Sequence, residues 1–118
     1  MLASNRDDHG KNHGFLYENQ QWRLGPAYDL TFTSPQMLPE RGMSIAGERK
    51  SAGRTELLKL AETQALDRRQ ANAIIDETCA GIARWREFAG QAGVPVLKAV
   101  EVERLLTRSL GPQLDMNP

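Results

Sequence analysis

Apolar side chains recur at three- and four-residue steps through the second half of the chain, and this spacing constrains the fold more than any other feature. One stripe extends over about five turns at 3.6 residues per turn, so it predicts one long amphipathic helix. Asp67, with Gln70 three residues later, has the capping-box pattern of a helix start, and Gly93 and Pro95 are expected to end the helix. The stripe consists of Ala71, Ile74, Ile75, Thr78, Cys79, Ile82, Trp85 and Ala89.

Segments on both sides of this stripe predict two further helices. Thr55 can cap a helix whose apolar residues are Leu57, Leu58, Leu60 and Ala61. A third helix is expected from about Val96 to Leu110, where Gly111-Pro112 would stop it. Its expected buried side chains are Leu97, Val100, Leu105 and Leu106.

The first half of the chain contains the features of loops and a β-hairpin. The polar turn Glu18-Asn19-Gln20-Gln21 separates two short apolar runs, Phe15-Leu16-Tyr17 and Trp22-Arg23-Leu24, and Gly25-Pro26 ends the second strand. Residues 33–42 predict a loop, and Met43-Ser44-Ile45-Ala46 predicts one more short strand. We therefore expect a mostly α (α+β) single domain over 1–118, with loop and hairpin in 1–48 and about three helices in 54–110.

Composition excludes several classes of protein. Lys+Arg and Asp+Glu balance at 15 each, so no net field favours nucleic acid or an anionic membrane. We expect neither as a partner, since no run of 18 apolar residues could cross a bilayer either. Met1-Leu2-Ala3-Ser4 is too short, and its sequel too charged, for a signal peptide. The single cysteine, Cys79, rules out an internal disulfide and fits the reducing cytoplasm, the expected location.

A candidate catalytic loop lies near the start of the chain, in Asn5-Arg6-Asp7-Asp8-His9-Gly10-Lys11-Asn12. Asp7 and Asn12 have the D-x-x-x-x-N spacing of a kinase catalytic loop, and Asp29 follows the expected hairpin in Pro26-Ala27-Tyr28-Asp29-Leu30. Phosphoryl transfer needs a carboxylate near the attacking hydroxyl and oxygen ligands for Mg²⁺. In this interpretation Asp7 accepts the hydroxyl proton and Asn12 and Asp29 bind the metal. Lys11 would neutralise the phosphoryl group.

The same residues allow other interpretations. His9 and His13, together with the nearby aspartates, could suggest zinc, but glycines at positions 10 and 14 argue against the helix that this histidine spacing needs. Asp7 and Asp29 could also be turn formers, a common role of aspartate. In the kinase interpretation His9 supports the shape of the loop through hydrogen bonds.

Residues outside this loop are expected to be structural. Cys79 lies on the apolar stripe and is expected to be inert packing. Trp85 and Phe88 are expected to pack in the core or between lobes. Arg49-Lys50 with Arg54 forms a small basic cluster, which we interpret as a solvated loop in preference to a contact with an acidic partner or a DNA backbone.

The Asn5–Asn12 string, the hairpin containing Trp22, and Pro26–Leu30 together resemble the C-terminal part of HipA-like kinases, and the similarity extends over roughly residues 1–90. This resemblance implies a serine/threonine kinase toxin of a bacterial toxin–antitoxin pair, a two-lobed protein-kinase-like fold, and ATP and Mg²⁺ as cofactors. It also implies a helix-turn-helix antitoxin as partner. Asp7 matches the catalytic aspartate, Asn12 a magnesium ligand, and Asp29 the aspartate of D-F-G.

The sequence departs from that family in what it does not contain. No glycine-rich G-x-G-x-x-G loop and no nucleotide-contacting lysine precede Asp7. We therefore expect an isolated C-lobe piece with little or no kinase activity alone. The alternative is a non-catalytic interaction module that assembles with itself, with a separate N-lobe chain or with an antitoxin, because a C-lobe without its upstream packing would expose apolar surface.

Overall fold

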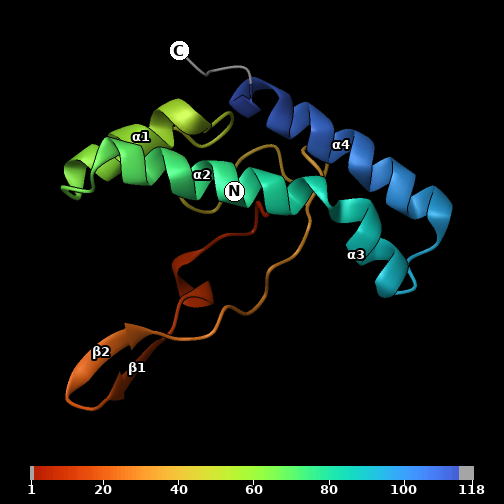
Figure 1. Cartoon of the computed structure of the whole chain (residues 1–118). Coiled ribbons are helices and arrows are strands. Elements are labelled where there is room, and N and C mark those ends of the chain that lie inside the picture. Colours follow the sequence, from red (N-terminus) through yellow and green to blue (C-terminus); the bar gives the residue numbers. More distant parts are fainter. Residues whose placement is uncertain (1, 115–118) are drawn as a thin grey trace.

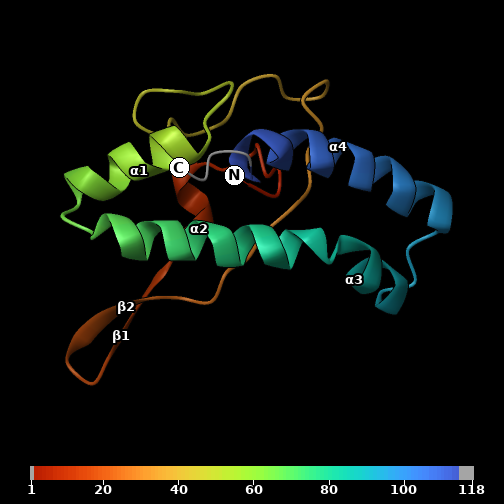
Figure 2. The same ribbon diagram turned by 45° about the horizontal axis from the view of Figure 1, so that its top comes forward.

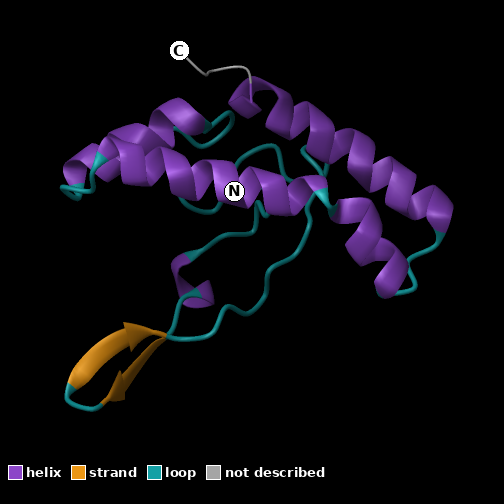
Figure 3. Cartoon of the chain, viewed as in Figure 1, coloured by secondary structure: helices purple, strands orange, loops and turns teal. Residues whose placement is uncertain are grey.

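The computed structural model describes residues 2–114 and shows a mostly helical chain with one small hairpin, which confirms the predicted fold class (Figures 1 and 3). A long irregular segment, residues 25–53, joins the hairpin to the helices and is called the connecting segment below. The elements in chain order are the 3-10 helix η1 (Gly10–Asn12), strands β1 (Phe15–Glu18) and β2 (Gln21–Leu24), and helices α1 (Arg54–Thr63), α2 (Arg68–Ala83), α3 (Trp85–Gln91) and α4 (Val96–Leu114).

The predicted hairpin is present and projects away from the helices (Figures 1 and 2). β1 and β2 pair antiparallel, with Phe15 opposite Leu24 and Glu18 opposite Gln21. Asn19 and Gln20 both have positive φ, of 51° and 62°, which is the backbone of a tight two-residue hairpin turn. The side chains of both strands are exposed, so the hairpin contributes nothing to the apolar core.

The core lies where α1 and α4, one after the other, pack along α2 (Figure 2). The predicted cap is confirmed, because the Asp67 side chain accepts a hydrogen bond from the backbone nitrogen of Gln70 at 3.0 Å. Cys79 is buried as expected, and burial raises the pKa of its thiol. The buried cluster contains Leu2, Leu58, Ala61, Ala71, Ile75, Cys79 and Leu110.

The prediction of a single long helix across residues 71–89 is wrong, because the chain forms two helices that meet at Arg84. Arg84 has ψ of 12°, which ends α2 and starts α3. The Trp85 Nε1 then donates to the backbone carbonyl of Ala99 in α4, at 2.9 Å. The break lets α3 pack on α4, and the described part of the chain therefore has four helices rather than about three.

The boundaries and buried face of the flanking helices also differ from expectation. α1 starts after Gly53 rather than at a Thr55 cap, because the Glu56 carboxylate accepts from the Gly53 backbone nitrogen at 2.9 Å. α4 continues past Gly111-Pro112 to Leu114. A proline costs one helical hydrogen bond, but its fixed φ is itself helical.

The side chains expected to be buried in α4 lie partly on the wrong face. Leu97 is 86% exposed and Val100 is 44% exposed. The face that packs against α2 and α3 contains Ala99, Val102, Leu106 and Leu110. These residues follow three- and four-residue steps, and Leu97 and Val100 lie outside that register.

Two expectations for the connecting segment are also wrong. Residues 43–46 form no strand; Ile45 and Glu48 exchange backbone hydrogen bonds of 2.9 and 3.0 Å around Ala46 and Gly47, whose positive φ makes a tight turn. Arg54 is buried rather than solvated. It donates to Asn72 at 2.8 Å and forms an ion pair with Asp76.

No helix within residues 2–114 is long and apolar enough to cross a membrane.

Candidate active site

The candidate catalytic loop is closed by a hydrogen bond between its two ends. Asn12, at the end of η1, donates through Nδ2 to the backbone carbonyl of Asp7 at 3.0 Å. Its backbone nitrogen donates to the carbonyl of His9, also at 3.0 Å. The structure therefore brings Asp7 and Asn12 together and leaves Asp7 exposed. Because Nδ2 is engaged, the Oδ1 of Asn12 is the atom that remains for a cation.

The exit of the hairpin is tied to the same loop. The Tyr28 hydroxyl donates to the backbone carbonyl of Lys11, and the Lys11 side chain is exposed. Asp29 follows with φ of 54°, in the left-handed region that aspartate tolerates better than most residues. Its carboxylate is exposed and forms no hydrogen bond or ion pair with the described side chains, so neither kind of bond joins it to Asp7 or Asn12.

A small cavity of about 230 Å³ lies between the loop and the hairpin exit. Asn12 lines it together with Tyr28 and Leu30, the two neighbours of Asp29. Asn5 lines it as well, and its buried Oδ1 has no hydrogen-bond partner within the described residues. Asp8 is the carboxylate that lines this cavity, and Asp29 is not among the lining residues. The Asn5 amide oxygen without a partner, with the oxygens of Asn12 and Asp8 in the same lining, is a donor set that suits a hard cation such as Mg²⁺.

Asn5 is a candidate ligand that the sequence reasoning missed. It is the first residue of the Asn5–Asn12 string and lies two residues before Asp7. An uncharged amide in a polar loop carries little signal by itself, because asparagine is common in turns. Only the cavity, which Asn5 and Asn12 both line, distinguishes Asn5 from an ordinary turn residue.

An ion pair between Asp8 and Arg41 joins the candidate catalytic loop to the connecting segment. Arg41 is 3% exposed and lies 3.6 Å from the Asp8 carboxylate, measured from Nη1 to Oδ2. Arg41 also donates to the Asn5 carbonyl at 2.9 Å, and Asp8 accepts from the Met43 backbone nitrogen at 3.2 Å. Burial lowers the pKa of Arg41, and the charge of Asp8 opposes this effect. Asp8 and Arg41 therefore fix the position of the candidate catalytic loop relative to the connecting segment.

Gly42 allows the loop and the connecting segment to approach closely. Its backbone nitrogen donates to the Arg6 carbonyl at 3.0 Å. A Cβ at this position would lie 3.2 Å from the His9 backbone nitrogen and 3.3 Å from the Asp8 carbonyl carbon. Since both neighbours are backbone atoms, a larger residue would push the candidate catalytic loop away.

His9 supports the loop through its backbone, because its carbonyl accepts from the Asn12 backbone nitrogen at 3.0 Å. The His9 Nδ1 is buried and has no hydrogen-bond partner in the described part of the chain. No group of three His, Cys, Asp or Glu side chains within residues 2–114 is placed to hold a metal ion, which is against the zinc interpretation.

Comparisons with known proteins identify the family. Residues 1–86 match the HipA-like C-terminal domain. The chain is 32% identical over 95 residues to a protein of Sinorhizobium fredii (strain NBRC 101917 / NGR234) named "Putative kinase Y4mE", and the match covers 74% of this chain and 23% of that relative. The chain thus spans about a quarter of the length of the curated relative, and no solved structure matches it. The chain belongs to the HipA-like C-terminal domain family, which confirms the resemblance that the two motifs indicated.

Proposed function

We propose that this chain supplies the catalytic-loop and metal-binding half of an ATP- and Mg²⁺-dependent serine/threonine protein kinase. The observation that carries the proposal is the hydrogen bond from Asn12 to the Asp7 carbonyl, which holds the two ends of the D-x-x-x-x-N loop together. The family match and the kinase named among the relatives support the same chemistry.

In this proposal each residue has a defined task. The hydroxyl oxygen of a serine or threonine attacks the γ-phosphorus of ATP, the bond to the β–γ bridging oxygen breaks, and ADP leaves. The exposed Asp7 carboxylate orients the hydroxyl and accepts its proton. Asn12 and Asp29, with Asn5 as a further oxygen donor, would hold Mg²⁺, which when bound offsets the charge of the phosphates. Lys11 would stabilise the charge of the transferred group.

The proposal includes a requirement for a second lobe. Residues 1–118 contain no glycine-rich phosphate loop, so they offer nothing that would grip the nucleotide and align its γ-phosphate. We expect the purified 118-residue chain to incorporate no more radiolabelled phosphate from ATP than its Asp7→Ala variant. Robust autophosphorylation by the chain alone, abolished by Asp7→Ala, would contradict this requirement.

The biological setting is proposed from the family alone. On that ground the chain acts in the cytoplasm as part of a toxin, with a helix-turn-helix antitoxin or a separate N-lobe chain as partner. The DNA on either side of the coding sequence tests this. An upstream frame that encodes a glycine-rich loop and a strand lysine would support the kinase, and an adjacent helix-turn-helix gene whose product co-purifies would support the antitoxin.

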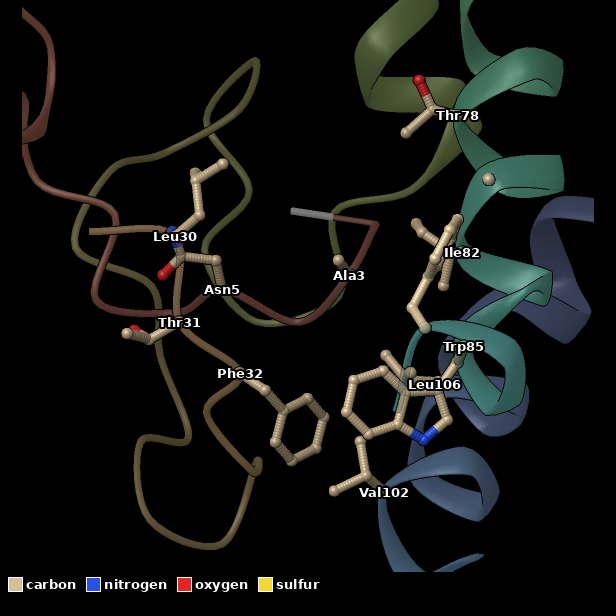
Figure 4. Close-up of a pocket in the computed structure, with 12 residues that line it drawn as sticks. Ala3, Asn5, Leu30, Thr31, Phe32, Thr78, Ile82, Trp85, Val102 and Leu106 are labelled. Carbon is tan, nitrogen blue, oxygen red and sulfur yellow. The ribbon is translucent and has the colours of Figure 1, made fainter. Parts of the chain in front are cut away.

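A second candidate function is assembly through an apolar pocket. The pocket has a volume of about 440 Å³ and lies between the segment after the hairpin and helices α2, α3 and α4. Figure 4 shows Leu30 and Phe32 from that segment on one side and Ile82 and Trp85 on the other. Phe88, 42% exposed, also lines it. Exposed apolar surface of this kind marks a site where chains associate.

Self-association through this pocket has a direct test. If two copies meet here, Leu30→Glu will convert an associated species into a monomer in sedimentation velocity. Leu97→Glu is the matched control, because Leu97 is 86% exposed on α4 and does not line the pocket. A wild-type chain that sediments strictly as a monomer and binds little hydrophobic dye would contradict self-assembly.

A further inference from the structure

A further pocket, whose described lining residues differ from those of the candidate metal site, is strongly basic. It has a volume of about 410 Å³ and lies between the candidate catalytic loop, the connecting segment and α4. Four cationic side chains line it, from Arg6, Arg41, Lys50 and Arg108, and none of the described aspartates and glutamates does. Ser51, from the connecting segment, and Ser109, from α4, also line the pocket with hydroxyl groups. The lining therefore offers many donors to an anion.

The positive charge of this pocket is only partly neutralised. Asp8 pairs with Arg41 at 3.6 Å and Glu40 pairs with Lys50 at 3.5 Å, and neither carboxylate lines the pocket. Arg108 forms no hydrogen bond or ion pair with the described residues. Two of the four cations, Arg6 and Arg108, thus have no carboxylate partner in the part of the chain that the structure describes.

Arg6 is fixed in place by neutral groups. Its guanidinium donates to the backbone carbonyls of Pro39 at 2.8 Å, Leu38 at 3.3 Å and Lys50 at 3.4 Å. Its Nε is buried and has no hydrogen-bond partner among residues 2–114. The pKa of the buried Arg41 is lowered first by burial and further by the charge of Arg6, so the two arginines repel each other across this region. An anion between them would relieve that repulsion and satisfy donors.

We propose that this pocket binds a phosphate dianion, either free or carried as the monoester of a serine or threonine side chain. Arginine is suited to this ligand because its planar guanidinium donates two parallel hydrogen bonds to phosphate oxygens. Lys50 adds a point charge, and the two serine hydroxyls add donors that an oxyanion accepts. Arg6 directly precedes Asp7 in the chain, and no described residue lines both this pocket and the Asn12 cavity, so the bound phosphate would lie next to the candidate catalytic loop in a separate site.

Titration of the ¹⁵N-labelled 118-residue chain tests this proposal with three probes: inorganic phosphate, O-phospho-L-serine and L-serine. We expect both phosphates, and not L-serine, to shift the amide signals of Arg6, Ser51 and Ser109. Tighter binding of O-phospho-L-serine identifies a phosphorylated side chain as the ligand. Binding of inorganic phosphate alone identifies the free ion.

Arg108→Ala is the informative variant, because Arg108 is exposed on α4 and its loss should leave the fold intact. We expect it to weaken phosphate binding about tenfold, since a hydrogen bond to a charged group contributes on that order. Arg69→Ala removes the same charge from an exposed position on α2 outside the pocket and should change the affinity less than twofold. Absence of shifts with both phosphates, or equal weakening in the two variants, would overturn the proposal.

Discussion

Gly42 is closely surrounded by backbone atoms of the candidate catalytic loop, and Gly81 has open space around it. Substituting alanine at each position tests how closely the loop and the connecting segment approach each other. A Cβ on Gly42 would meet the backbone of Asp8 and His9 at 3.2 to 3.4 Å, and one on Gly81 in α2 would have nothing within 4 Å. We expect Gly42→Ala to lower the free energy of unfolding by about 1–3 kcal/mol through overpacking. Gly81→Ala should raise it by about 0.5–1 kcal/mol, because alanine favours a helix. Urea denaturation measures both; equal effects would contradict the close approach at Gly42.

The residues of the candidate site differ in how far the sequence could predict them. Asp7, Asn12 and Asp29 have a spacing and context that indicate chemistry without a structure. Asn5 and Arg41 could not be found in this way. Their importance comes from a cavity and from the hydrogen bond between Arg41 and the Asn5 carbonyl, which joins residues 36 positions apart in the chain, and no local pattern marks such a contact.

Among the helices, one indole hydrogen bond joins the start of α3 to α4. Trp85→Phe keeps an aromatic ring but removes the Nε1 donor to the Ala99 carbonyl, so the free energy of unfolding should fall by about 1 kcal/mol. Trp22→Phe is the control, because Trp22 is 70% exposed on the hairpin and should change stability by less than about 0.5 kcal/mol. Urea denaturation followed by far-UV circular dichroism compares them. A larger loss in Trp22→Phe would contradict this account of the helices.

Periodicity predicted that helices exist but not where they break or which face they bury. The stripe from Ala71 to Ala89 continues across Arg84, because one non-helical residue barely changes the register of apolar positions. In the sequence of α4, Leu97 and Val100 lie three residues apart on one apolar face. Val102 and Leu106 lie four residues apart on another. Only the packing of α4 on α2 and α3 determines which face is buried. The hairpin was predicted well, since its turn and pairing are local.

At the scale of the whole molecule, the two halves are stabilised by different interactions. The helices contribute almost all of the buried apolar cluster, and Leu2 is its one member from the first half of the described chain. The loop, the hairpin exit and the connecting segment are joined instead by polar contacts such as Asp8 with Arg41 and Tyr28 with Lys11. The geometry of the candidate site therefore follows from hydrogen bonds and charge pairing, which sequence patterns encode weakly.

We propose that Asn12 and Asp29 form the metal-binding edge of a kinase site, and binding of Mn²⁺ is a direct test of this. Mn²⁺ accepts the same oxygen ligands as Mg²⁺, and its unpaired electrons broaden the NMR signals of nearby residues. We expect the amide signals of Asn12 and Asp29 to broaden first when Mn²⁺ is added to the 118-residue chain. Asp29→Asn should remove this effect, and Glu77→Gln, which removes an exposed carboxylate on α2, should preserve it. Broadening that spares Asn12 and Asp29, or that persists unchanged in Asp29→Asn, would contradict the account.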